Sequence, residues 1–191
     1  MVQQRIQKVS PRSLWACAVA ACALWGCSPA LNWRTVAVDG AGLTLALPCK
    51  PDHGTRAIPM GAQTVNISMV GCEAHGKMFA ISWMEGQDPA SIAPKLTLWH
   101  AAVRAQLGLP PAAPGTAAQE VPFVPNGALG VPQSVRMKAQ GKRPDGGDVQ
   151  ADAVWFARIV QGRAQLLHGV VYSDKRDEGA ADTFFQGIHL N

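Results

Sequence analysis

Several motifs that identify enzymes are missing from the 191-residue sequence. It has no Gly-x-Ser-x-Gly nucleophile elbow and no Ser-x-x-Lys pair. A His-Glu-x-x-His zinc motif and a glycine-rich phosphate loop are absent as well. The chain also lacks an apolar run of the roughly 20 residues that a membrane-spanning helix needs. These absences exclude the enzyme classes that use those motifs, and we expect a protein without catalytic activity, metal or other cofactor.

The N-terminal segment is first basic and then apolar. Arg5, Lys8 and Arg12 occur there without any acidic side chain, and a short apolar run follows from Leu14 to Trp25. A basic stretch followed by about 7–15 apolar residues is typical of a secretory signal peptide. The sequence therefore predicts an exported chain whose signal is removed.

The four residues Leu24-Trp25-Gly26-Cys27 resemble a lipobox, the cleavage motif of bacterial lipoproteins. Three of them match its pattern, whereas Trp25 is bulkier than usual at its position. The resemblance implies that the signal covers residues 1–26 and that acyl chains on Cys27 anchor the protein to a bilayer. It also implies the outer membrane, facing the periplasm, since Ser28 rather than Asp follows the cysteine. The alternative is an ordinary cleaved signal that happens to contain a cysteine.

Removal of this signal changes the charge of the chain. The whole sequence has 17 Lys and Arg against 13 Asp and Glu, and loss of the three basic signal residues leaves 14 against 13. A nearly neutral mature chain gives no sign of the basic surface that nucleic-acid binding needs. We expect the lipid bilayer and an unidentified envelope protein as partners, and no nucleic acid.

Cysteine usage agrees with an oxidising compartment. Cys17 and Cys22 lie in the signal and Cys27 is consumed by lipid, so Cys49 and Cys72 remain. An even pair of cysteines in an exported chain favours a disulfide. The alternative is two small buried thiols that do not meet.

Six segments predict strands, because apolar and polar residues alternate in them or because the segment is apolar throughout. They are residues 43–47, 65–69, 79–83, 135–139, 149–160 and 163–172. The last two are apolar on both faces and are expected at the centre of the sheet. Apolar residues from Ile92 to Leu107 recur at helical spacing and predict a long helix, and Ala181–Ile188 predicts a short one.

This order of elements predicts an α+β fold in a single domain, residues 32–191, after a short tether at 27–31. The expected architecture is an antiparallel β-sheet of about six strands, covered on one face by the long central helix and the short C-terminal helix. Polar residues alternate with apolar ones in most strands, so we expect the other face of the sheet to be solvated.

The same order of elements resembles the PsbP-like fold that many small bacterial lipoproteins share. Leu43–Cys49 matches the opening strand into a proline turn, Asp88–Leu107 the central helix, and Thr183–Phe185 the aromatic residues near the end. The turn Pro48–Pro51 is also similar to that of uncharacterised proteobacterial lipoproteins. The resemblance implies a fold and no particular activity, because that group has no assigned function and one fold can serve many functions.

Few residues are candidates for chemistry. Cys72, Glu73 and His75 offer three types of metal ligand within four residues, but a disulfide at Cys72 would remove this site. Asp145 and Asp148 flank two glycines, where aspartate is favoured for its turn geometry rather than for catalysis.

A small basic cluster and one tryptophan are candidates for membrane contact. The cluster consists of Arg136, Lys138, Lys142 and Arg143. It suits either a solvated strand face or contact with anionic lipid headgroups. Trp33 lies six residues after the lipidated cysteine, where its ring can rest at the membrane interface.

These observations favour a membrane-anchored periplasmic lipoprotein that acts as a non-catalytic binding or envelope-assembly module. The alternative is a carrier of small apolar ligands, with a pocket between the sheet and the long helix. An enzyme is a third hypothesis, which requires a pocket that gathers His75 or His168 with a carboxylate.

The substitution Cys27→Ser is expected to abolish acylation, because serine has no thiol to receive the lipid. Metabolic labelling with palmitate should then mark the parent protein and not the variant, and the variant should leave the membrane fraction. Cys17→Ser, which changes a cysteine inside the signal, is the matched control and should stay labelled. Equal labelling of Cys27→Ser and the parent would contradict the lipobox interpretation.

Overall fold

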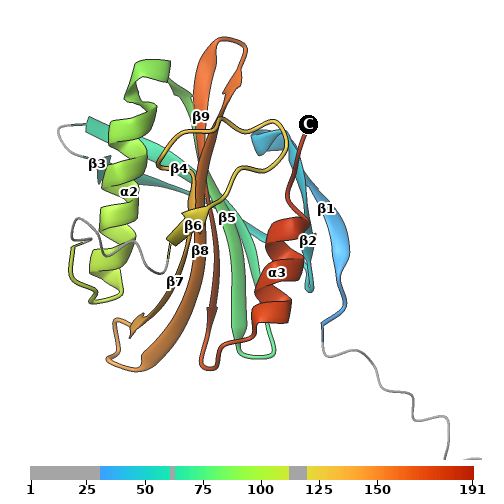
Figure 1. The fold of residues 1–191 in the computed structure, drawn as a ribbon. Coiled ribbons are helices and arrows are strands. Elements are labelled where there is room, and N and C mark those ends of the chain that lie inside the picture. Colours follow the sequence, from blue (N-terminus) through green and yellow to red (C-terminus); the bar gives the residue numbers. More distant parts are fainter. Residues whose placement is uncertain (1–30, 61–62, 112–119) are drawn as a thin grey trace, which may run out of the picture. The chain divides into compact units, whose positions relative to one another are not determined.

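The computed structural model describes residues 31–60, 63–111 and 120–191, which form two antiparallel sheets and two α-helices (Figure 1). The α+β class and the antiparallel pairing are confirmed, whereas the prediction of one sheet of about six strands is wrong. The predicted signal at 1–26, Cys27 and most of the tether lie outside the described residues. Among the helices that the structure describes, none is long and apolar enough to span a membrane.

The large sheet has seven strands in the order β3-β4-β5-β9-β8-β7-β6, and the small sheet has the order β1-β2-β10. The strands of the large sheet are β3 (Asp52–Met60), β4 (Gln63–Ala74), β5 (Lys77–Gln87), β6 (Glu120–Pro122), β7 (Val135–Lys142), β8 (Asp148–Val160) and β9 (Arg163–Ser173). Those of the small sheet are β1 (Arg34–Val38), β2 (Leu43–Leu47) and β10 (His189–Leu190). Strand β9 is central, with β5 and β8 beside it. The central position of β9 and β8 agrees with the prediction from their apolar sequences, whereas β5 was predicted only as an alternating strand.

All six predicted strands are present, as β2, β4, β5, β7, β8 and β9. Strands β1, β3, β6 and β10 were not predicted. Strand β3 is exposed along nearly its whole length, so no buried face marks it in the sequence. It forms because it pairs with β4, from Asp52 opposite Gly71 to Met60 opposite Gln63.

Helix α2 (Ile92–Gln106) begins after a 3-10 turn at Pro89–Ser91. The carboxylate of Asp88 accepts a hydrogen bond of 3.0 Å from the backbone N–H of Ala90, which satisfies a donor that this first turn leaves free. The predicted apolar face is confirmed by the burial of Ile92, Leu96, Trp99, Val103 and Leu107. The chain then leaves the helix at Gly108, whose φ of 66° is in the left-handed region.

Helix α3 (Glu178–Gln186) packs on the opposite face of the large sheet from α2. Neighbouring side chains of a strand point to opposite faces, and those of Leu166 and Leu167 on β9 lie in the α2 core and the α3 core respectively. The prediction that both helices cover one face, with the other face solvated, is therefore wrong. Strands β8 and β9 are apolar on both faces, so each face needs its own cover.

The small sheet completes the cover on the α3 face. Leu43, Leu45 and Leu47 of β2 are at most 1 % exposed and share a core with Phe79 and Phe184. At one end, the small sheet is held to the large sheet by Arg158 of β8, a residue that is only 6 % exposed. Its N–H groups donate to the backbone oxygens of Ala41 and Gly42 at 2.6 and 2.9 Å and to that of Asn191 at 3.0 Å. Four acceptors, counting the side chain of Gln165 at 2.7 Å, compensate for burying the charge.

At the other end, a disulfide links the small sheet to the large sheet. Cys49, just after β2, is bonded to Cys72 of β4, with 5.9 Å between their Cα atoms and 23 positions between them in the sequence. The predicted pairing is confirmed. It ties the small sheet to the large one near the turn between β4 and β5.

Replacing both cysteines in Cys49→Ala/Cys72→Ala is expected to lower the free energy of unfolding by about 3 kcal/mol, because an open loop of this length has more freedom in the unfolded chain. Urea unfolding of the oxidised protein, the reduced protein and the double variant measures the loss. The double variant with and without reductant is the control and should not change. Equal unfolding midpoints for oxidised and reduced parent protein would contradict this role of the bridge.

Candidate functional site

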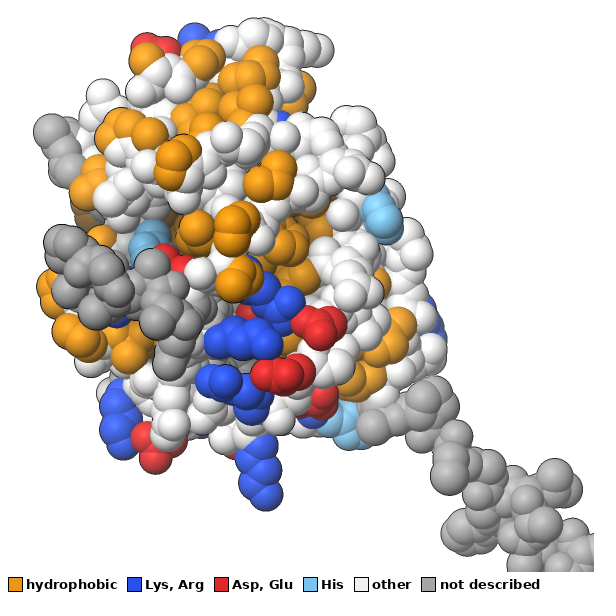
Figure 2. Space-filling model, viewed as in Figure 1, with side chains coloured by type: hydrophobic (Ala, Val, Ile, Leu, Met, Phe, Trp, Pro, Cys, Tyr) orange, Lys and Arg blue, Asp and Glu red, His pale blue; other side chains and the backbone are white. Residues whose placement is uncertain are grey.

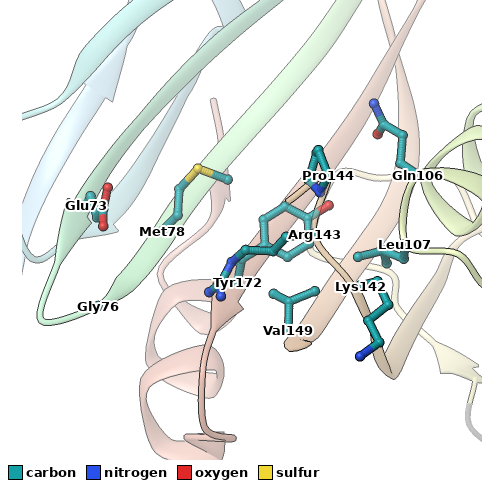
Figure 3. Close-up of a pocket in the computed structure, with 10 residues that line it drawn as sticks. All are labelled: Glu73, Gly76, Met78, Gln106, Leu107, Lys142, Arg143, Pro144, Val149 and Tyr172. Carbon is teal, nitrogen blue, oxygen red and sulfur yellow. The ribbon is translucent and has the colours of Figure 1, made fainter. Parts of the chain in front are cut away.

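A pocket of about 420 Å³ lies at one end of the large sheet, on the face that α2 covers (Figure 3). The β4–β5 hairpin, the β7–β8 hairpin and the end of α2 form its walls. Sites for small molecules usually measure about 300–1,000 Å³. The pocket is therefore large enough for a small ligand.

The interior of the pocket is apolar and its rim is polar. Leu107 and Val149 are 5 % and 3 % exposed, and the ring of Tyr172 lies in the centre of the view in Figure 3, with Met78 on one side. The polar residues around them are Glu73, Gln106, Lys142 and Arg143. Such a lining suits a ligand with an apolar body and a polar group that stays near solvent.

A close backbone contact fixes the shape of the pocket between α2 and β7. The N–H of Lys142 donates a hydrogen bond of 2.9 Å to the carbonyl of Leu107. A Cβ atom on the preceding Gly141 would lie 2.5 Å from that same carbonyl oxygen. Only glycine permits this approach, so the end of α2 and the β7–β8 hairpin hold each other in place.

The charged groups of the rim are largely neutralised by neighbours. Lys142 lies 2.7 Å from the carboxylate of Asp148, and Arg143 lies 2.6 Å from that of Asp174. Burial raises the pKa of Tyr172 above its ordinary value, because a phenolate is poorly solvated there. Its hydroxyl is therefore protonated at neutral pH and available for a neutral hydrogen bond.

The basic cluster predicted from the sequence is divided in the structure. Arg136 and Lys138 contact α3, through Asp182 at 2.7 Å and Glu178 at 3.0 Å, whereas Lys142 and Arg143 lie at the pocket. Each of the four pairs with a carboxylate, and Figure 2 shows acidic side chains between the basic ones on this face. This pairing leaves little net positive charge for lipid headgroups. Contact of these residues with a membrane stays a prediction.

Arg136 has the most complete set of partners among the cluster residues. It makes two hydrogen bonds to Asp152, at 2.7 and 2.6 Å, and its guanidinium lies 4.9 Å from the ring centre of Phe185. The hydrogen bonds to Asp152 raise its pKa further above its ordinary value. Arg136 therefore acts as a link between the large sheet and α3.

Trp33 is half-buried against the domain. Its ring lies edge-on to that of Phe79, with 5.4 Å between the ring centres. This contact places the first described residues at the end of the sheet where the β4–β5 turn lies. A membrane contact of Trp33 stays a prediction.

The other candidates from the sequence have structural roles. Cys72 is bonded to Cys49 and is not available as a metal ligand, and the described residues contain no cluster of three His, Cys, Asp or Glu that could hold a metal. Asp145 accepts a hydrogen bond of 2.9 Å from Gly147 within its turn. His75 lies in the β4–β5 turn with a φ of 50°.

A second group of polar side chains lies sealed between α2 and the sheet. His168 of β9 is 6 % exposed, and its ring centre lies 5.4 Å from Trp99 and 4.9 Å from Trp155. Its Nε2 and the indole N–H of Trp155 have no hydrogen-bond partner among the described residues. Burial, followed by the charge of His100, lowers the pKa of His168 to about 3.

His100 connects this group to the end of the sheet. Its Nε2 lies 3.1 Å from a carboxylate oxygen of Glu120 on β6, and Arg104 lies 3.6 Å from the same oxygen. Burial lowers the pKa of His100 more than Glu120 raises it. These contacts fasten α2 to the edge strand β6.

The sequence pattern did not bring His168 and His100 together, because they lie on different elements of the chain. The pocket was not located at its actual position either. Its Met78, Leu107 and Val149 come from three separate elements. The one signal that marks the place is Gly141, a glycine in a strand, which often indicates a close backbone approach.

Because of His168, the free energy of unfolding should decrease as the pH is lowered. The unfolded chain takes up a proton near pH 6.5, whereas the folded protein resists protonation down to about pH 3. The free energy of unfolding should therefore decrease as pH falls between these values, by up to about 1.4 kcal/mol per pH unit from this residue. His168→Phe keeps an aromatic ring in place and should flatten that slope in urea unfolding between pH 7 and 4. The exposed His53→Gln is the control, and an unchanged slope in His168→Phe would show that other groups cause the acid sensitivity.

Comparisons with known proteins do not add to this description. The chain matches no protein-family model, and a search of curated proteins finds no match either.

Proposed function

We propose that the protein is a lipid-anchored, non-catalytic binding module of the bacterial cell envelope. In this proposal Cys27 carries the acyl chains, and the domain lies on the periplasmic side of the outer membrane. The domain binds a small molecule with an apolar body in the pocket at the end of α2. The observation that carries the binding function is that pocket, with its buried apolar interior and polar rim.

The nature of the lining supports an apolar or amphipathic ligand. Leu107, Val149 and Met78 provide apolar contact, whose burial is worth about 25 cal/mol per Å². The neutral hydroxyl of Tyr172 provides one hydrogen-bonding group, while Lys142 and Arg143 are already paired with carboxylates. A ligand without a strong charge therefore suits the pocket best. This is the carrier function that the sequence analysis kept as its alternative.

The place of the pocket in the domain supports binding near a membrane. Trp33 packs on Phe79, which is paired with Cys72 at the end of β4. The next residues along the hairpin, Glu73 and Gly76, line the pocket. The first described residue, Leu31, follows Cys27 by four positions, a chain length that spans at most about 14 Å. A pocket at this end of the sheet is suited to exchange ligand with the lipid surface.

A second candidate function is assembly with another protein. The observation that favours it is β3, a nine-residue strand at the end of the described sheet, where β4 is its one described neighbour and nearly its whole length is exposed. An unpaired strand edge can accept another strand through main-chain hydrogen bonds.

The pocket is tested by filling it. Met78 is 38 % exposed and lines the pocket, so Met78→Trp should occupy the space at little cost to the fold. We expect the apolar dye N-phenyl-1-naphthylamine to bind the parent protein, with enhanced fluorescence, and to bind Met78→Trp at least tenfold more weakly.

Met69→Trp is the matched control, because Met69 is 43 % exposed on the same face but does not line the pocket. It should bind the dye as the parent does. Equal binding by the parent and Met78→Trp would place the apolar site elsewhere, and no binding by the parent would argue against an apolar ligand.

A further inference from the structure

The two edges of the large sheet are very different. At one edge, β6 has three residues and ends in Pro122, so it offers little main chain to another strand. At the other edge, β3 has nine residues, and Asp52 to Pro59 are all exposed. Figure 1 shows β3 at the margin of the sheet, with β4 on its inner side.

Strand β3 lacks most of the features that protect natural sheet edges from pairing. Such edges are short, covered, or carry lysine or proline. Strand β3 contains no lysine, and its one proline, Pro59, is next to the end of the strand. Among the described strands, only β4 pairs with the stretch from Asp52 to Ile58, so its outer edge is available to another strand.

No described residue explains the glycine at position 54 in this stretch. Its φ is not positive, and a Cβ atom built on it would meet nothing within 4 Å. Glycine in a strand costs stability and often marks a place where another backbone approaches closely. The glycine therefore suits a contact that lies outside this chain.

The charges on either side of Gly54 would be complementary between two copies of β3. Asp52 and Arg56 lie two positions before and after the glycine, so their side chains are on the same face of β3. Neither forms an ion pair with any described residue. If two β3 strands paired antiparallel about a two-fold axis at Gly54, each Asp52 would face Arg56 of the other copy.

We propose that β3 is the dimer interface of this protein and pairs antiparallel with β3 of a second copy, with Gly54 on the two-fold axis. The arrangement is two-fold symmetric, as in most homodimers. It pairs Asp52–Arg56 of one copy with the same five residues of the other, and the remaining residues of β3 extend beyond the paired stretch. Met69 of β4, which is 43 % exposed, is the partner of Gly54 within the sheet and therefore lies next to the proposed contact. This interface is independent of the pocket at the end of α2.

The register is tested with single cysteines in the full-length lipidated protein in its membrane. Residues that face each other across an antiparallel pair have Cα atoms about 4.5–5.5 Å apart, which is within disulfide range. Gly54→Cys should therefore form a covalent dimer on mild oxidation, seen on non-reducing gels. Ala57→Cys is the matched control, because its copies lie about 20 Å apart in this register and should not link.

The charge complementarity is tested by exchange. In Arg56→Asp, the new aspartate would face Asp52 of the other copy at two symmetric places. This variant should weaken dimerisation at least tenfold. Light scattering of the detergent-purified lipoprotein over a dilution series measures the change. The double variant Asp52→Arg/Arg56→Asp restores opposite charges and should recover the dimer to within about threefold of the parent.

Three results would overturn the proposal. The first is a protein that is monomeric at all concentrations and gives no Gly54→Cys cross-link. The second is equal cross-linking of Gly54→Cys and Ala57→Cys. The third is a double variant, Asp52→Arg/Arg56→Asp, that dimerises as weakly as Arg56→Asp. None of these variants changes a residue that lines the pocket, so dye binding should be unaffected, and failure here is distinguishable from failure of the proposed binding function.

Discussion

Burial of both faces of the central strands is the constraint on which this structure depends. Leu166 and Leu167 of β9 are adjacent, point in opposite directions, and are both fully buried. Because a strand turns alternate side chains to alternate faces, such a strand needs one cover for each face. Helix α2 provides the first, and α3 with the small sheet provides the second. The two features proposed to bind, the pocket at the end of α2 and the open edge of β3, lie where these covers end.

The second cover is held by a few specific interactions as well as by apolar packing. Arg158 joins the turn after β1 and the C-terminal residue to β8, and the Cys49–Cys72 bridge joins β2 to β4. Arg136 adds a link from β7 to α3 through Asp182. A buried guanidinium is tolerated only if its donors find acceptors, and Arg158 finds four. Arg158 and Arg136 therefore hold elements of the fold together.

Much of the fold could be predicted because its signals are local. The apolar stripe from Ile92 to Leu107 defines a helix by its own spacing, and cysteine counting left one pair to be bridged. Strand β3 could not be found in this way, since its residues are exposed and it exists by pairing with β4. The arrangement of the helices was missed for a related reason. An amphipathic helix shows which of its faces is buried, but it does not show which side of a sheet it will cover.

By itself, the sequence determined the class of the fold, the six main strands and the buried face of α2, because propensity and periodicity act over short distances. It favoured the Cys49–Cys72 pair, and the structure confirmed that bridge. Only the tertiary structure decided the second sheet, the two-sided cover and the pocket, whose walls Met78, Leu107 and Val149 come from three distant segments. It also decided that the carboxylates of Asp174 and Glu178 neutralise Arg143 and Lys138, which lie 31 and 40 positions away. Contacts of this kind depend on which elements meet in space, and a one-dimensional pattern does not contain that information.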